Sequence, residues 1–125
     1  MKNPGVKNTG GLQNAGGAEG FARRQCHPLH KGTAPMSAAE VEALLRDFPG
    51  WTLRDAAIEK TFAFSDYHHT IAFVNAVAWI AHQQDHHPEL NVFYDRCRVS
   101  FNTHSIGGIS ENDFICAARI EGILG

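Results

Sequence analysis

The sequence has no apolar run approaching the roughly 20 residues that a membrane-spanning helix needs, so we expect no association with a membrane. Cysteine is also scarce. The three cysteines, Cys26, Cys97 and Cys116, are an odd number at unrelated spacings, and no secretory apolar region precedes them. These features do not fit a disulfide-stabilised secreted protein, and we predict a reduced protein in the cytoplasm.

Clustered positive charge is missing from most of the chain. Residues 1–35 carry five basic residues and one acidic residue, Glu19, which gives a net charge of +4. Residues 36–125 carry 6 basic and 12 acidic residues, which gives −6. Because binding to phosphates needs clustered Lys and Arg, we expect residues 36–125 not to bind nucleic acid.

Large apolar side chains are rare in residues 1–35, which hold 7 of the 12 glycines and show no helical or strand periodicity. Such a segment cannot bury enough apolar surface to offset the entropy cost of ordering, so we predict a disordered, glycine-rich basic tail. Cys26, His27 and His30 resemble metal ligands, but a structural zinc site needs four ligands held by a fold. We expect no metal site there and one domain over residues 36–125.

Residues 36–125 alternate between helix-capping signals and strand-like runs. Ser37, Asp66 and Ser110 each stand where a helix is expected to begin. Two runs with alternating apolar residues, 51–64 and 89–102, each predict a hairpin. The order helix, strand, strand, helix, strand, strand, helix predicts an α+β fold. This is a two-layer domain with a four-stranded antiparallel sheet and three helices packed on one face.

The long central helix, expected over about residues 66–84, is apolar over much of its circumference. A helix of this kind usually packs against two partners, in this case the sheet and a second subunit, so we expect a homodimer or homotetramer. The apolar stripe consists of Tyr67, Ile71, Val74, Val77, Ala78 and Ala81, and Phe73, Trp79 and Ile80 widen it.

The second hairpin is expected to turn at Asp95 and Arg96. That register pairs apolar residues on one side of the ribbon, which is the alternation of a strand pair with one buried face. A slip of one residue would break this match. The expected pairs are Tyr94 with Cys97, Val92 with Val99, and Leu90 with Phe101.

The same register, continued to the open end of the hairpin, places His87 opposite His104. Directly opposed residues have Cβ atoms about 5 Å apart. Together with His86, these residues are predicted to form an imidazole cluster on the face that the core does not use. Because histidine has an unperturbed pKa near 6.5, such a cluster suits proton transfer near neutral pH.

The stretch from His82 to Asp113 also resembles the signature of the pterin-4a-carbinolamine dehydratases, a family also known as the dimerization cofactor of a homeodomain transcription factor. The resemblance rests on His-His-Pro-Glu at 86–89, on Tyr94, on Thr103-His104, and on Gly-Ile-Ser at 108–110. Gly-Trp at 50–51 and the long helix extend it to about residues 37–124, and the predicted tail lies outside it.

The resemblance implies dehydration of a 4a-hydroxytetrahydropterin to a quinonoid dihydropterin and water, which regenerates the cofactor of aromatic amino-acid hydroxylases. It implies a pterin substrate, no metal, no organic cofactor, and a functional link to a phenylalanine hydroxylase. By resemblance the catalytic residues are His86, His87 and His104, and the pterin site is lined by Asp85, Pro88, Thr103 and Ser105. Which histidine is the acid and which is the base stays open.

Two residues depart from the family pattern. His82 stands where many members have glutamate, and Leu90 stands where many have tryptophan. A glutamate one helical turn before His86 would raise the pKa of a nearby imidazole, whereas a protonated His82 would lower it. The rate or the pH optimum is therefore expected to differ from that of glutamate-bearing members.

Several alternatives stand beside this interpretation. Asp113 is interpreted as a helix cap, because Ser110 lies three residues before it. His82, His86 and His104 could be read as three metal ligands, but the resembled family works without metal. The alternative function is a non-enzymatic dimerization module on the same fold, similar to a transcriptional coactivator. A related pterin or another substrate is a further alternative.

Overall fold

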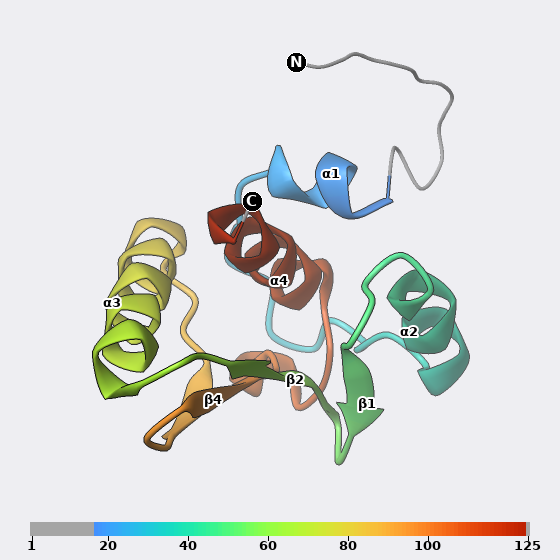
Figure 1. Cartoon of the computed structure of the whole chain (residues 1–125). Coiled ribbons are helices and arrows are strands. Elements are labelled where there is room, and N and C mark those ends of the chain that lie inside the picture. Colours follow the sequence, from blue (N-terminus) through green and yellow to red (C-terminus); the bar gives the residue numbers. More distant parts are fainter. Residues whose placement is uncertain (1–16, 125) are drawn as a thin grey trace.

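The computed structural model describes residues 17–124. In chain order the elements are α1 (Gly17–Ala22), α2 (Ala38–Leu45), β1 (Thr52–Arg54), β2 (Ala57–Ala63), α3 (Tyr67–Gln84), β3 (Glu89–Val92), β4 (Arg96–Phe101), a 3-10 turn (His104–Ile106) and α4 (Glu111–Ile123). The strands form one antiparallel sheet in the order β1-β2-β4-β3, and α2, α3 and α4 lie on one face of it (Figure 1). The predicted α+β fold is confirmed.

The first hairpin forms over β1 and β2 as predicted. Its two turn residues, Asp55 and Ala56, both have positive φ (50° and 63°), which matches the twist of a tight two-residue hairpin. Ile58 and Phe62 point from β2 into the core and are almost completely buried. The period-2 pattern in this part of the sequence therefore identified the core face of the strand.

The second hairpin differs from the predicted register by two residues. Its turn lies at Tyr94 and Asp95, because the amide of Phe93 donates to the carbonyl of Arg96 at 2.8 Å. The predicted turn at Asp95 and Arg96 is therefore wrong. The observed pairs are Val92 with Cys97, Asn91 with Arg98, Leu90 with Val99, and Glu89 with Ser100.

Contacts from outside the hairpin hold the observed turn. The amide of Phe64, just after β2, donates to the carbonyl of Asp95 at 2.8 Å. The hydroxyl of Thr70, in α3, lies 3.0 Å from the carbonyl of Tyr94. Both groups come from parts of the chain that a reading of the hairpin alone does not consider.

The shift of register preserves the buried face but changes the histidine geometry. A shift of two residues leaves the same side chains on the core side, and Cys97, Val99 and Phe101 are indeed buried. Continued to the open end, however, the observed register does not place His87 opposite His104. The predicted pairing of these two histidines is therefore wrong.

The three helix starts expected from the capping signals are confirmed. Ser37 and Ser110 each form a capping box at the start of α2 and α4. Asp66 caps α3, and its carboxylate accepts from the amide of His69 at 2.9 Å. These local bonds satisfy amides that a helix start leaves without intrahelical partners.

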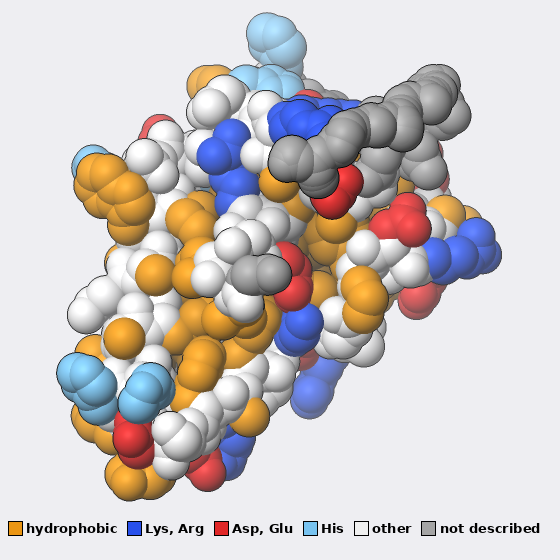
Figure 2. Space-filling view, turned by 45° about the horizontal axis from the view of Figure 1, so that its top comes forward, with side chains coloured by type: hydrophobic (Ala, Val, Ile, Leu, Met, Phe, Trp, Pro, Cys, Tyr) orange, Lys and Arg blue, Asp and Glu red, His pale blue; other side chains and the backbone are white. Residues whose placement is uncertain are grey.

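Helix α3 turns a different stripe toward the sheet from the one predicted. Its buried residues are Thr70, Phe73, Val77 and Gln84, so Val77 of the predicted stripe and Phe73, which was expected to widen it, are the predicted residues that are buried. Tyr67, at the start of the predicted stripe, is 52% exposed. Figure 2 shows hydrophobic side chains exposed in a band between α3 and α4. Within residues 17–124, no helix is long and apolar enough to cross a membrane.

Residues 17–35, predicted to belong to a disordered tail, are ordered in the structure. Phe21 in α1 is 4% exposed, and its ring centroid lies 5.7 Å from that of Phe114 and 5.9 Å from that of Phe48. Residues 23–35, called the N-terminal strap below, continue from α1 past α4 to the start of α2 (Figure 1). Residues 1–16 of the predicted tail lie outside the described residues.

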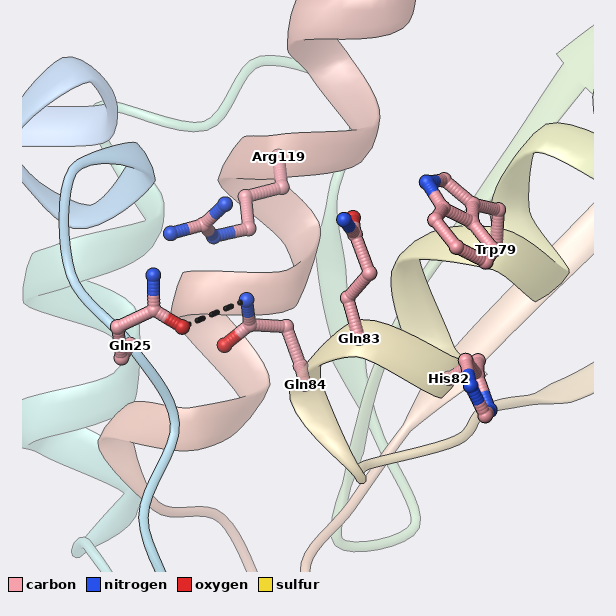
Figure 3. A pocket seen from close by; sticks show the side chains of 6 residues that line it. All are labelled: Gln25, Trp79, His82, Gln83, Gln84 and Arg119. Atoms are coloured by element: carbon pink, nitrogen blue, oxygen red, sulfur yellow. Dashed lines mark hydrogen bonds between the residues drawn. The ribbon is translucent and has the colours of Figure 1, made fainter.

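Polar side chains of α3 and α4 hold the N-terminal strap. The amide of Cys26 donates to Oε1 of Gln84 at 2.7 Å, and Nδ2 of Asn112 donates to the carbonyl of His27 at 2.7 Å. Figure 3 shows Gln84 and Arg119 on the two helices beside the strap. The composition of residues 1–35 could not reveal these anchors, because they satisfy strap backbone groups from elsewhere in the chain.

The register of the second hairpin can be tested at Thr70, which is completely buried. Its hydroxyl lies 2.8 Å from the carbonyl of Asp66 and 3.0 Å from that of Tyr94. In Thr70→Val the Asp66 carbonyl keeps the Thr70 amide as its donor, but the Tyr94 carbonyl loses the hydroxyl that holds the turn. We therefore expect a loss of about 1–3 kcal/mol in the free energy of unfolding. Urea denaturation measures it. Thr61→Val, at an exposed strand position, is the control, and an equal loss in both variants would contradict the account.

Candidate active site

The centre of the site is a hydrogen bond between His86 and Asp113. Nε2 of His86 lies 2.6 Å from Oδ1 of Asp113, whose side chain is completely buried, and the His86 side chain is 13% exposed. The second carboxylate oxygen accepts from the Thr103 hydroxyl at 2.8 Å and from the Ser110 amide at 2.9 Å. A carboxylate only accepts hydrogen bonds, so three donors satisfy this buried group.

Three chain segments converge on this pair. Asp85 ends α3 in the left-handed region (φ 51°), which turns the chain sharply, and the amide of His86 donates to the carbonyl of Ala81 at 3.1 Å. The His86 ring then stacks on Phe101 of β4, with centroids 5.9 Å apart and planes 8° apart. Asp113 is the third residue of α4 and the acidic member of its capping box.

A small polar network supports the carboxylate. The amide of Thr103 donates to the carbonyl of Gly108 at 2.7 Å, which closes the loop around the 3-10 turn. The hydroxyls of Thr103 and Ser110 lie 2.6 Å apart. Because the Thr103 hydrogen points at Asp113, the Ser110 hydroxyl donates to Thr103. All three side chains are buried, so the network fixes the position of the carboxylate.

The electrostatics of the pair favour a protonated imidazole. Burial by itself lowers the pKa of His86, because it penalises the charged ring. The hydrogen bond to Asp113 and the charge of that carboxylate act in the opposite direction, and together they raise the pKa of His86 above its ordinary value. The site therefore favours the protonated form of His86 more than water does.

His86 of this pair lines a cavity of about 200 Å³ beneath the N-terminal strap. Four of the seven predicted site residues line this cavity: Asp85, His86, Thr103 and Ser105. Its remaining walls are Gln84, Asn112 and residues 26–29 of the strap. No sequence pattern indicated that the strap would form a wall of the site, because this role depends on how the strap packs against α3 and α4.

A groove of about 410 Å³ adjoins the cavity at Asp85, which lines both. Two more predicted residues, His87 and Pro88, lie in this groove, together with the two departures from the family pattern, His82 and Leu90. The groove falls within the range of roughly 300–1,000 Å³ that is usual for small-molecule sites. Cavity and groove together bring six of the seven predicted residues to one region.

The seventh predicted residue, His104, is not among the residues that line the cavity or the groove. It is exposed and begins the 3-10 turn. Its two neighbours, Thr103 and Ser105, do line the cavity. The loop that carries His104 therefore borders the site, although the predicted cluster of three histidines is not formed by hairpin pairing.

Asp113 is the functional residue that the sequence interpretation left out. It is a helix cap, as predicted, but only one of its oxygens is used in the cap. The other oxygen bonds His86, which lies 27 positions earlier. An acidic capping residue on an apolar helix indicates that its carboxylate is buried and needs a further hydrogen-bond donor. The sequence does not identify that donor, because His86 meets Asp113 only in the folded structure.

Another cavity, of about 460 Å³, lies on the other side of Gln84 and is shown in Figure 3. It is larger, but its lining holds no carboxylate paired with an imidazole, so we place the chemistry at His86 instead. Within residues 17–124, no group of three or more His, Cys, Asp or Glu side chains could hold a metal ion. The expectation that no cofactor is used stays a prediction.

The fold and the site define a small α+β protein with a buried carboxylate–imidazole pair suited to acid–base chemistry. A sequence profile of the family described as pterin 4 alpha carbinolamine dehydratase matches residues 34–123. The chain belongs to this family, as the resemblance predicted.

Curated relatives and a solved structure agree with this placement. The chain is 52% identical over 105 residues to a protein of Nitrosomonas eutropha, which covers 83% of this chain and 93% of that one. It is 50% identical over 101 residues to a protein of Nitrosospira multiformis, which covers 81% and 89%. Both carry the name "Putative pterin-4-alpha-carbinolamine dehydratase".

Two solved structures share the fold. A transcriptional coactivator/pterin dehydratase from Brucella melitensis matches with a TM-score of 0.69 at 33% identity, over 73% of this chain and 99% of that one. A pterin dehydratase-like protein identified as a RuBisCO assembly factor in the alpha-carboxysome matches with a TM-score of 0.50 at 20% identity, over 77% and 95%. At that identity the second match supports the fold alone.

The effect of Asp113 on His86 can be measured by an NMR titration of the imidazole. In Asp113→Asn the carboxylate charge is gone while burial remains, so the pKa of His86 should fall below its wild-type value. The control is Glu111→Gln, a carboxylate-to-amide change on the first residue of α4 that leaves Asp113 in place. An unchanged pKa in Asp113→Asn would contradict the proposed electrostatics.

The same variant should change how stability depends on pH. Because the folded-state pKa of His86 lies above its ordinary value, the pair stabilises the fold fully below the unfolded-state pKa, and this contribution is lost as the pH rises through the folded-state pKa. The free energy of unfolding of Asp113→Asn should therefore fall further below the wild-type value at a pH under the unfolded-state pKa of His86 than at a pH above its folded-state pKa. Urea denaturation at several pH values measures this difference.

Proposed function

We propose that the chain dehydrates a 4a-hydroxytetrahydropterin to a quinonoid dihydropterin and water by acid–base catalysis. The reaction needs a proton for the leaving hydroxyl and the removal of a proton from a ring nitrogen. The observation that carries the proposal is the 2.6 Å hydrogen bond between His86 and the buried Asp113, at the wall of a cavity, in a chain of this dehydratase family.

In this proposal His86 is the general acid. Its Nε2 is engaged by Asp113, which leaves Nδ1 as the nitrogen that can donate to the substrate. The carboxylate raises the pKa of His86 above its ordinary value, which favours the acid form of the ring. Asp113 itself acts as a positioning residue, because it fixes the orientation and the charge of the ring.

A second histidine would take the proton from the ring nitrogen. His87 lines the groove that adjoins the cavity at Asp85, and His104 stands on the loop between two residues that line the cavity. Each of them is therefore within the region where a bound pterin would lie. The variants His87→Ala and His104→Ala distinguish which of the two histidines is the base.

The remaining predicted residues are proposed to bind the pterin. Asp85, Thr103 and Ser105 offer polar groups in the cavity, and Pro88 adds an apolar wall in the groove. A flat, polar heterocycle fits a site with a few polar groups and an apolar face. His82 and Leu90 also line the groove, so the two departures from the family pattern would act on substrate binding.

The physiological role that we propose is recycling of the pterin cofactor of aromatic amino-acid hydroxylases in the cytoplasm, with a functional link to a phenylalanine hydroxylase. The support for this role is the family to which the chain belongs. The reaction produces a quinonoid dihydropterin, which a reductase must convert back to the tetrahydropterin before a hydroxylase can use it again.

The breakdown of a 4a-carbinolamine, followed by absorbance in a stopped-flow mixer, tests the catalytic assignment. We expect wild-type protein to accelerate it and His86→Ala to lose on the order of 10²–10⁴ in kcat. Of His87→Ala and His104→Ala, the variant that lacks the base should show a comparable loss. His68→Ala, at an exposed position at the start of α3, is the control, and no acceleration by folded wild-type protein would overturn the proposal.

A second candidate function is a dimerization module, and one observation favours it. The free edge of the sheet, β3, and the neighbouring start of α3 expose a set of apolar side chains, called the association surface below. Tyr67 and Tyr94 stack across it, with ring centroids 6.3 Å apart. The exposed fractions are 52% for Tyr67, 39% for Val92 and 66% for Tyr94.

The association surface supports a homodimer or homotetramer first, because an unpaired strand edge flanked by apolar residues suits pairing with a second copy. The Brucella melitensis structure, described as a transcriptional coactivator/pterin dehydratase, makes a protein partner the alternative for the same surface. Loss of activity in His86→Ala without loss of association would show that the two functions use different parts of the chain.

The oligomeric state is tested by light scattering coupled to size-exclusion chromatography. We expect wild-type protein to be a dimer or tetramer. Val92→Lys should shift it toward the monomer, because a charge on a strand edge opposes edge pairing. Thr52→Lys places the same charge on the opposite edge strand, β1, and should leave the mass unchanged. A monomeric wild-type protein would contradict the proposed association.

A further inference from the structure

Two of the three cysteines face each other between the N-terminal strap and α4. Sγ of Cys26 lies 3.6 Å from Sγ of Cys116, and all three cysteines are free thiols. Cys26 is partly exposed and lines the cavity beside His86. Cys116 is completely buried, and its sulfur lies 3.8 Å from the carbonyl oxygen of His86. The two thiols therefore lie where the strap contacts the wall of the site.

We propose that Cys26 and Cys116 form a reversible disulfide when the protein meets a low-molecular-weight disulfide of the glutathione type, and that this bond fastens the N-terminal strap to α4. The bond is a modification site of its own. It does not depend on the proposed pterin chemistry, so the failure of either proposal can be recognised separately.

The geometry favours this bond because the strap is already held at the cysteine. The amide of Cys26 donates a hydrogen bond to the Gln84 side chain. The amide of His27 donates to the side-chain oxygen of Asn112, and the side-chain nitrogen of Asn112 donates to the carbonyl of His27. The sulfurs need to approach from 3.6 Å to the S–S bond length of about 2.05 Å. Because the backbone around Cys26 is fixed, Cys116 acts on it at a high effective concentration.

The two thiols have complementary reactivity. The hydrogen bond from Cys116 lowers the pKa of Cys26, and burial of Cys26 opposes this effect only in part. The same interaction, together with burial, raises the pKa of Cys116, which keeps its proton. Cys26 is thus the partly exposed sulfur that ionises first and attacks, and Cys116 is the buried sulfur that completes the reaction.

The reaction balances in two exchange steps. The Cys26 thiolate attacks one sulfur of the small disulfide, forms a mixed disulfide and releases one small thiolate. Cys116 then loses its proton to water and attacks the Cys26 sulfur, which forms the protein disulfide and releases the second small thiolate. The two cysteine sulfurs are oxidised, and the small disulfide is reduced to two thiols.

The third cysteine provides an internal reference. Cys97 is completely buried on β4, and burial raises the pKa of its thiol. Its sulfur contacts the carbonyl of Arg98 and not another thiol. We therefore expect Cys97 to stay reduced under conditions that oxidise the pair.

The test uses the full chain, first reduced and then incubated with oxidised glutathione at neutral pH. Intact-mass analysis should show a loss of about 2 Da, thiol titration should fall from three thiols to one, and peptide mapping should join the peptides of Cys26 and Cys116. The new bond closes a long loop, so the melting temperature should rise on the order of 10 °C and return on reduction.

Control variants make each outcome decisive. Cys97→Ser should form the same bond, whereas Cys26→Ser should keep both remaining thiols and show no rise in melting temperature. Cys116→Ala, if folded, should instead accumulate the mixed disulfide at Cys26. Three titratable thiols after incubation, or a wild-type protein that stops at the mixed disulfide, would overturn the proposal.

Discussion

The structure depends on one buried carboxylate and the donors that satisfy it. Asp113 is completely buried and takes hydrogen bonds from His86, Thr103 and Ser110. A buried charge without partners would be strongly unfavourable, so the end of α3, the loop before α4 and the start of α4 must meet at this point. The same bonds that hold these segments together also orient and charge His86, so stability and chemistry share one network.

Local sequence signals predicted the helices and strands better than the register and contacts between them. The caps at Ser37, Asp66 and Ser110, and the alternation in β2 and β4, depend on neighbouring residues, and the structure confirms them. The turn of the second hairpin lies one residue earlier than predicted, and its strand pairing is shifted by two residues, because Phe64 and Thr70, from other elements, form hydrogen bonds with the turn carbonyls. Register depends on such distant contacts, and a hairpin considered alone does not contain them.

The site shows the same difference between features that depend on neighbouring residues and features that depend on distant contacts. The resemblance named seven residues, and six of them line the cavity or the adjoining groove. The role of Asp113 toward His86 was missed, because its capping motif already explained its presence in the sequence. The N-terminal strap was missed because its order depends on Gln84 and Asn112, two polar residues that lie far along the chain. The composition of a segment indicates how much apolar surface it can bury by itself. It does not indicate which side chains of other helices will form hydrogen bonds with its backbone.

The measurement that tests the central claim most directly is the pH dependence of kcat/KM for 4a-carbinolamine dehydration in wild-type protein and in Asp113→Asn. If Asp113 holds the catalytic proton on His86, the rate falls as the pH rises through the pKa of His86. This alkaline limb should lie at a lower pH in the variant, because the pKa of His86 has fallen. An alkaline limb at the same pH in both proteins would contradict the claim that His86 supplies the proton under the control of Asp113.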